Sequence, residues 1–211
     1  MDQRLQSMID MSFKLNDEIA LLVGDAKAPV GRRAVLATAM CTVAIDHGSG
    51  QRLLVMTDHV VTALALVRVQ FEALIRATWM LHGATDEWLE RFTTPKAPED
   101  NDETVMGPPV QSMLKAIDTS APPFVGKMLR EFKNATWKPM NSFVHGGVHA
   151  VVNALVDTPP DKLVSLLRNA NGMSFLAAQI LVIASNDPSL AGRIRSIQMA
   201  NVGALPPLAS P

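Results

Sequence analysis

The segment from Gln51 to His82 contains neither proline nor glycine, and this constrains the fold more than any other feature of the sequence. Between Val60 and Val67 every residue except Thr62 is apolar. An uninterrupted segment of this length exceeds an ordinary strand and fits one helix of roughly 45 Å, with a bend near Asp58. We therefore predict a long central helix that runs through the middle of a helical bundle.

The composition favours a single all-α domain. Apolar residues make up 48% of the 211 residues, aromatic residues make up 5%, and tyrosine is absent. Leu, Ala, Val and Met must therefore fill the core, and a core of this kind favours helices over sheets. We predict one helical domain over residues 1–202, followed by a disordered tail over residues 203–211.

Periodicity, glycines and prolines define the remaining elements. Apolar residues at steps of three and four from Leu5 to Leu22 predict a first helix that ends at Gly24. We expect a buried helix over 34–45, ended by the sequence DHGSGQ at 46–51, and further helices at about 85–92, 110–117, 124–134, 162–183 and after residue 188. The segment 93–109 is rich in proline and acidic residues, which predicts a flexible, solvated loop.

Charge and cysteine content exclude several classes of protein. The net charge is −1, so no overall field attracts the chain to DNA or to an acidic membrane. The single cysteine, Cys41, rules out an intrachain disulfide framework and a cysteine-rich metal site. The N-terminal sequence lacks the apolar core of a signal peptide, and no segment forms a clean apolar span of about 20 residues. We therefore expect a cytoplasmic protein without a membrane or DNA partner.

Three charged residues interrupt the predicted central helix at spacings of four. Arg68, Glu72 and Arg76 therefore share one helix face, and Trp79 continues that face three residues further on. The first interpretation is a solvated stripe, in which each Arg–Glu pair contributes a few tenths of a kcal/mol. The second is a partly buried network in which every charge is paired, because an unpaired buried charge costs several kcal/mol. The apolar neighbours favour partial burial.

The stretch MNSFVHGGVHA, residues 140–150, concentrates polar side chains in an apolar part of the chain. If the chain is helical from Val144, His145 and His149 lie one turn apart and share a metal ion only with a distant third ligand, for which Glu72 and Asp46 are the candidates. The pattern lacks the glutamate of the zinc helix motif, so we expect no metal and no cofactor.

Two other interpretations of this stretch remain open. In the first, His145 transfers a proton, Asn141 and Ser142 orient a substrate oxygen, and an arginine of the central helix holds a phosphate, which suits metal-independent cleavage of RNA by its own 2′-hydroxyl. In the second, Asn141 or Ser142 caps a helix, His145 hydrogen-bonds to the Arg–Glu face, and the glycines permit close packing.

Two stretches, RVQFEALIRATWML at 68–81 and WKPMNSFVHGG at 137–147, occur together and in this order. They resemble an uncharacterised bacterial family of small helical proteins related to the HEPN superfamily (higher eukaryotes and prokaryotes nucleotide-binding domains), over about residues 34–152. The resemblance implies a bundle of four or five main helices that is commonly a homodimer. In active HEPN ribonucleases, an arginine followed four to six residues later by a histidine forms the catalytic pair, and such proteins act as toxins, in phage defence or in RNA processing.

The chain departs from this catalytic pattern. His145 matches the histidine, but Pro139 and Met140 occupy the expected arginine positions, and Lys138 lies one step further out. Lysine is a poor replacement for a bidentate phosphate clamp. We therefore predict a HEPN-like, non-catalytic protein that dimerises or binds a partner, with a buried Arg/Glu/His network.

The alternative is a metal-independent ribonuclease or a nucleotide-binding effector. In that case His145 is the acid–base group, Arg68 and Arg76 bind phosphate, Glu72 orients the arginines and Asn141 positions the substrate. The further binding residues would be Ser142, His149, Trp79 and Lys138. A basic strip beside the site fits RNA contact or a solvated helix face, and it comprises Lys127, Arg130, Lys133 and Lys138.

Overall fold

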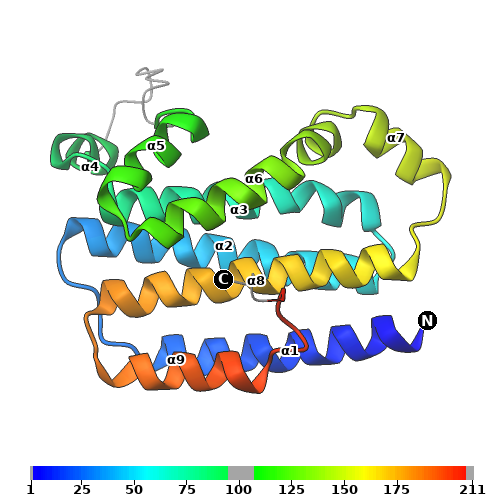
Figure 1. The fold of residues 1–211 in the computed structure, drawn as a ribbon, viewed down its shortest axis with the longest axis horizontal. Helices are drawn as coiled ribbons and strands as arrows, with labels where there is room; N and C mark the ends of the chain where they lie inside the picture. The colour runs from blue at the N-terminus through cyan, green and yellow to red at the C-terminus, as the bar shows by residue number, and fades with distance from the viewer. Residues whose placement is uncertain (1, 95–106, 208–211) are drawn as a thin grey trace.

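The computed structural model describes residues 2–94 and 107–207, and over these ranges the chain forms helices and no strand (Figure 1). The elements in order are α1 (Gln3–Gly24), α2 (Arg32–Met56), α3 (Val60–His82), α4 (Asp86–Thr93), α5 (Val110–Ser120), α6 (Pro123–Val144), α7 (Val148–Leu155), α8 (Pro160–Ser185) and α9 (Ser189–Ala200). The predicted all-α class is confirmed. Most of the predicted flexible loop at 93–109 lies outside the described residues.

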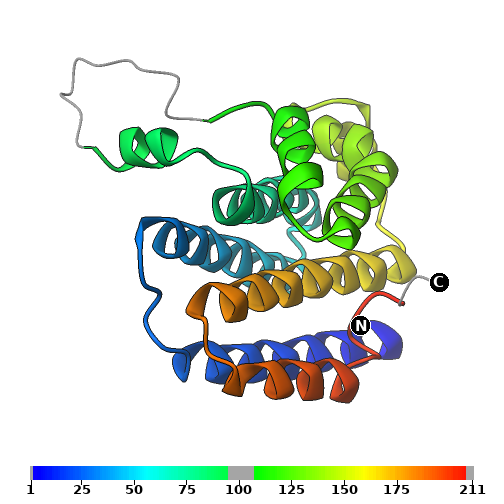
Figure 2. The ribbon, with the colours of Figure 1, turned by 60° about the vertical axis from the view of Figure 1, so that its left-hand side comes forward.

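The helices stack in layers (Figures 1 and 2). α1 and α9 form one outer layer, α2 and α8 form the middle layer, and α3 lies above them with α5 and α6. α2 packs against both α3 and α8, and α8 also packs against α1. Among the described helices, α8 alone is long and apolar enough to cross a bilayer, but 67% of its apolar window is buried inside the bundle.

The predicted long central helix from Gln51 to His82 is wrong, because the structure divides this segment between two helices. α2 continues through the glycines of DHGSGQ to Met56, and the chain reverses at residues 57–59 before α3 begins. Asp58 adopts a left-handed conformation with φ of 58°, which aspartate tolerates better than most residues. The expected bend near Asp58 is therefore a complete reversal, and α2 and α3 lie side by side (Figure 1).

Helix α2 passes through its glycines because tertiary packing requires one of them. A Cβ atom on Gly48 would lie 2.4 Å from Ser174 Oγ and 2.7 Å from Gln70 Nε2. A glycine inside a helix costs only about 1 kcal/mol relative to alanine, so packing against two neighbouring helices outweighs the local preference to end.

A buried polar layer joins the three central helices at this point. Gln51 Nε2 of α2 donates to Gln70 Oε1 of α3 at 2.7 Å. Gln70 Nε2 then donates to Ala170 O and to Ser174 Oγ of α8, both at 3.1 Å. Gln51 and Gln70 are fully buried, so these bonds pair both the oxygen and the nitrogen of the Gln70 amide where water has no access. The Oε1 atom of Gln51 has no hydrogen-bond partner among the described residues.

The predicted tail begins too early. Ala204 and Leu205 are buried in a second apolar cluster that α1, α8 and α9 form. Asn171 Nδ2 donates to Ala204 O at 3.0 Å and to Ser12 Oγ at 2.8 Å, so α8 fixes the backbone beyond α9. Residues 203–205 are therefore part of the domain rather than a disordered tail.

Helix α6 extends ten residues beyond its predicted end near residue 134 and includes Pro139. Proline lacks an N–H and normally breaks a helix interior. Here Met140, the residue after Pro139, is buried in the main core, and the partly buried Trp137 packs against the same core. Burial of these side chains offsets the lost backbone bond.

Replacement of Gly48 by alanine should lower the free energy of unfolding by about 1–3 kcal/mol, because the new methyl group overlaps the buried polar layer. Urea unfolding measures this change. The matched control is Gly192→Ala in α9, where nothing lies within 4 Å of the added Cβ, and this substitution should be neutral or stabilising by about 0.5–1 kcal/mol. Equal effects at the two positions would contradict the packing argument.

Cys41 should make stability depend on alkaline pH. Burial raises the pKa of its thiol from 9.0 to about 12. Above pH 9.0 the unfolded chain ionises its thiol while the folded chain does not, so ionisation favours unfolding as the pH rises from 9 towards 12. In urea unfolding at pH values on both sides of 9, Cys41→Ala should become steadily more stable relative to the wild type above that value. A constant difference would contradict the buried thiol.

Candidate functional site

The side chain of Arg68 joins α3 to the C-terminal end of α6. Its Nε atom donates to Glu72 Oε1 at 2.7 Å, one turn along α3. Its Nη1 atom donates to Asn141 Oδ1 and to His145 Nε2, the latter at 3.2 Å. The guanidinium carbon lies 4.8 Å from the ring centroid of Trp137, within the range of a cation–π interaction. We call these five residues the Arg68 cluster.

The cluster is half-buried, which agrees with the partial burial expected for Arg68 and Glu72 and corrects the expectation of a buried Arg/Glu/His network. The side chains of Arg68 and Glu72 are 20% and 26% exposed, and His145 is exposed at the end of α6. A guanidinium has no acceptor, so His145 Nε2 accepts the bond and the ring proton resides on Nδ1 in this arrangement. The cluster therefore consists of one ion pair and two neutral acceptors.

An elbow follows the cluster and separates the two histidines. His145 caps α6, Gly146 adopts a φ of 65°, and α7 begins at Val148. His145 and His149 therefore belong to different helices, and the premise that they lie one helical turn apart is wrong. Within the described part of the chain, no group of three or more His, Cys, Asp or Glu side chains is placed to hold a metal ion.

Comparison with known proteins places the chain in a family. The model of a family of unknown function, DUF6988, matches residues 41–207. The chain belongs to the DUF6988 family. No curated protein and no solved structure matches it. The matched region of this DUF6988 protein contains the whole Arg68 cluster, the elbow and α7.

Ser142 holds the elbow together. Its Oγ atom accepts a hydrogen bond from the backbone N–H of His149 at 3.0 Å and so caps the first turn of α7 from seven residues earlier. A Cβ atom on Gly147 would lie 2.5 Å from this Oγ, so the glycine permits the close approach. The ring of His149 packs 6.0 Å from that of Phe143. The predicted capping role of Ser142 is confirmed, although the helix that it caps is α7.

Two predicted site residues, Arg76 and Trp79, lie further along α3, beyond Glu72. Trp79 is 6% exposed, and its ring lies 4.6 Å from that of Trp88 in α4. Trp79 is therefore a core residue of this DUF6988 chain and no part of the Arg68 cluster. Arg76 is half-buried one turn beyond Glu72 on α3.

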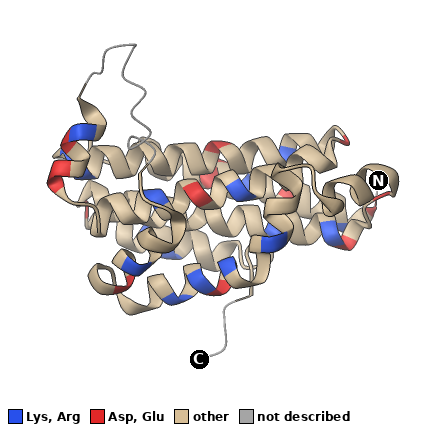
Figure 3. Cartoon of the chain, turned by 90° about the horizontal axis from the view of Figure 1, so that it is seen from above, with Lys and Arg blue, Asp and Glu red and all other residues tan. Residues whose placement is uncertain are grey.

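Two of the four cations in the predicted basic strip on α6 form ion pairs with carboxylates. Lys138 is exposed beside the Arg68 cluster. The other three cations have neighbours: Arg130 pairs with Asp118, Lys127 pairs with Glu131 at 4.0 Å, and Lys133 donates to Gln111 at 3.1 Å. Seen from above, segments with lysine or arginine and segments with carboxylates both occur along the helices (Figure 3). This distribution favours the solvated-face interpretation of the strip.

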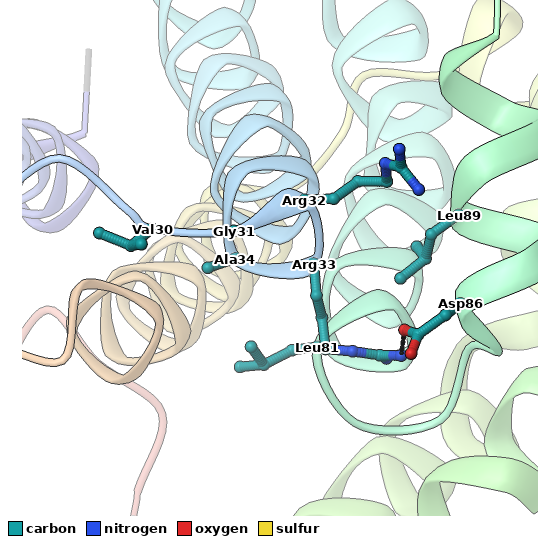
Figure 4. A pocket seen from close by; sticks show the side chains of 8 residues that line it. All are labelled: Val30, Gly31, Arg32, Arg33, Ala34, Leu81, Asp86 and Leu89. Atoms are coloured by element: carbon teal, nitrogen blue, oxygen red, sulfur yellow. Dashed lines mark hydrogen bonds and ion pairs between the residues drawn. The ribbon is translucent and has the colours of Figure 1, made fainter.

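A pocket of about 500 Å³ lies at the opposite end of α3, where α2 begins and α4 follows (Figure 4). Arg33 lines it and donates to Met80 O and Ala84 O at 2.8 Å and to Asp86 Oδ1 at 2.6 Å. The pocket is about 20 Å from Arg68 along the helix rise. Arg33 joins the end of α3 to the start of α4. Because of its distance from Arg68, the pocket is not an extension of the Arg68 cluster.

Sequence analysis missed Trp137, which belongs to the cluster. Its position four residues before Asn141 places both side chains on one face of α6, and this spacing was the available signal. Lys133, four residues earlier again, lies 5.3 Å from the same ring.

Replacement of Arg68 by methionine should lower the free energy of unfolding by about 1–3 kcal/mol, because Glu72 and Asn141 lose their half-buried donor. Urea unfolding measures the loss, and tryptophan fluorescence should change because Trp137 loses its cation. Arg195→Met is the control, since Arg195 is exposed on α9, and its effect should stay within about 0.5 kcal/mol. A similar loss of unfolding free energy in both variants would show that the Arg68 cluster does not stabilise the fold.

Proposed function

We propose that this protein is a HEPN-like, non-catalytic binding protein of the cytoplasm, in which the Arg68 cluster is a structural brace. Arg68 makes three hydrogen bonds in the cluster, and one of them is also an ion pair with Glu72. All three partners belong to the same domain as Arg68. A brace of this kind fixes the end of α6, and through the elbow it fixes α7. The function then belongs to the surface that α7 presents.

One observation carries this proposal. Along α7 an apolar stripe at positions i, i+3, i+4 and i+7 is exposed to solvent, and it consists of Val148, Val151, Val152 and Leu155. Such a stripe ordinarily faces a core. A contiguous apolar surface on a folded domain marks a binding site for another macromolecule.

The second candidate is the ribonuclease or nucleotide-binding effector, and a different observation favours it. His145 is exposed and accepts from Arg68 at 3.2 Å, and the ring of Trp137 lies on the guanidinium. An imidazole, a guanidinium and an aromatic ring are groups that bind a nucleotide and transfer its protons. Glu72 opposes this function, because its carboxylate neutralises the charge that a phosphate would need.

An RNA-cleavage assay with the wild type and His145→Ala separates the two candidates. We expect no cleavage by either protein and a loss of about 1 kcal/mol of unfolding free energy in the variant, because one exposed charge-assisted hydrogen bond disappears. Thermal and urea unfolding measure the second effect. Cleavage by the wild type would contradict the proposal, and its loss in His145→Ala would establish the second candidate.

A further inference from the structure

The exposed stripe of α7 lies in an uncharged part of the chain. No Asp, Glu, Lys or Arg occurs between Lys138 and Asp157. Val144 and Val156, on either side of α7 in the sequence, are also exposed. We call the surface formed by Val148, Val151, Val152 and Leu155 the α7 face. Leu155 at its end is 80% exposed.

Helix α7 is poorly stabilised within one copy of the chain. It has eight residues, and Ala150 is the one buried side chain among them. Isolated helices shorter than about 12 residues are marginal in water, and β-branched valines lower helix propensity further. α7 packs against α6 and α3, while the four residues of its stripe stay exposed to solvent in the described part of the chain. A second layer of apolar side chains on the α7 face would therefore stabilise the helix.

The absence of charge distinguishes the possible occupants of the α7 face. Helices that lie on membranes are rich in Lys and Arg along their polar side, and α7 has none. A charged protein partner selects complementary charges, which are equally absent. A second copy of this chain, in contrast, favours a face without charge. Near a two-fold axis each residue meets its own counterpart, so a charge there would face a like charge.

We infer that the α7 face is a homodimer interface, in which α7 pairs antiparallel with α7 of a second copy of this chain about a two-fold axis. This inference rests on the proposed function and names its partner. A standard interface buries roughly 800 Å² on each partner, and α7 is only about 12 Å long. The interface is therefore small, and the dimer should dissociate on dilution.

Sedimentation of the full chain over a range of concentrations tests the inference. The wild type should be a dimer at high concentration and a monomer at low concentration. Val151→Glu and Leu155→Glu should each raise the dimer dissociation constant by about tenfold or more, because every substitution occurs twice in the interface and desolvates a charge. Leu21→Glu is the matched control, since Leu21 is 68% exposed on α1, and it should dimerise like the wild type.

Three outcomes would overturn the inference. The first is a wild type that stays monomeric at every concentration. The second is a dimer that both α7 variants retain, or that Leu21→Glu disrupts. The third is a monomer that binds mixed phosphatidylcholine–phosphatidylserine vesicles and loses this binding in Leu155→Glu, which would make the α7 face a membrane surface. None of these outcomes depends on RNA cleavage, so the failure of the dimer and the failure of the non-catalytic proposal are separate results.

Discussion

The hydrogen bonds of Gln70 determine how the rest of the structure is arranged. Its amide lies where water cannot reach and must find partners on α2 and α8 at once. One rotation of α3 satisfies this requirement. Residues two positions away point roughly 200° around a helix, so the rotation that buries Gln70 turns Arg68 and Glu72 towards α6. The position of the Arg68 cluster is therefore a consequence of the polar layer in the core.

The Arg68 cluster in turn determines where α7 lies on the surface. Arg68 binds Asn141 and His145 in the last turn and cap of α6, so the end of that helix has a fixed place relative to α3. Ser142, from the same turn, caps α7 across Gly147. The direction in which α7 presents its stripe therefore depends on a charged side chain in another helix, although the stripe itself contains no charge.

The sequence predicted what depends on composition and on residue type, and it missed what depends on packing. The all-α class and the approach of Arg68 to His145 followed from spacing and chemistry. The end of α2 did not, because Gly48 signals only a small local cost and the contact with Ser174 that outweighs it is distant in sequence. The stripe on α7 was equally invisible, since a spacing of three and four indicates an apolar face without showing whether any element covers it.

Electrostatics of the cluster argue against phosphate chemistry in this arrangement. Arg68 carries one positive charge and Glu72, bound at 2.7 Å, carries one negative charge, so the pair presents no net charge to a phosphate. An anion would have to displace Glu72 or Asn141 and would then leave a half-buried carboxylate or amide without its donor, at a cost of about 1–3 kcal/mol. A site built for phosphate keeps its donors directed at the ligand before the ligand arrives. Arg68 instead directs them at its own domain, which is the arrangement expected of a brace.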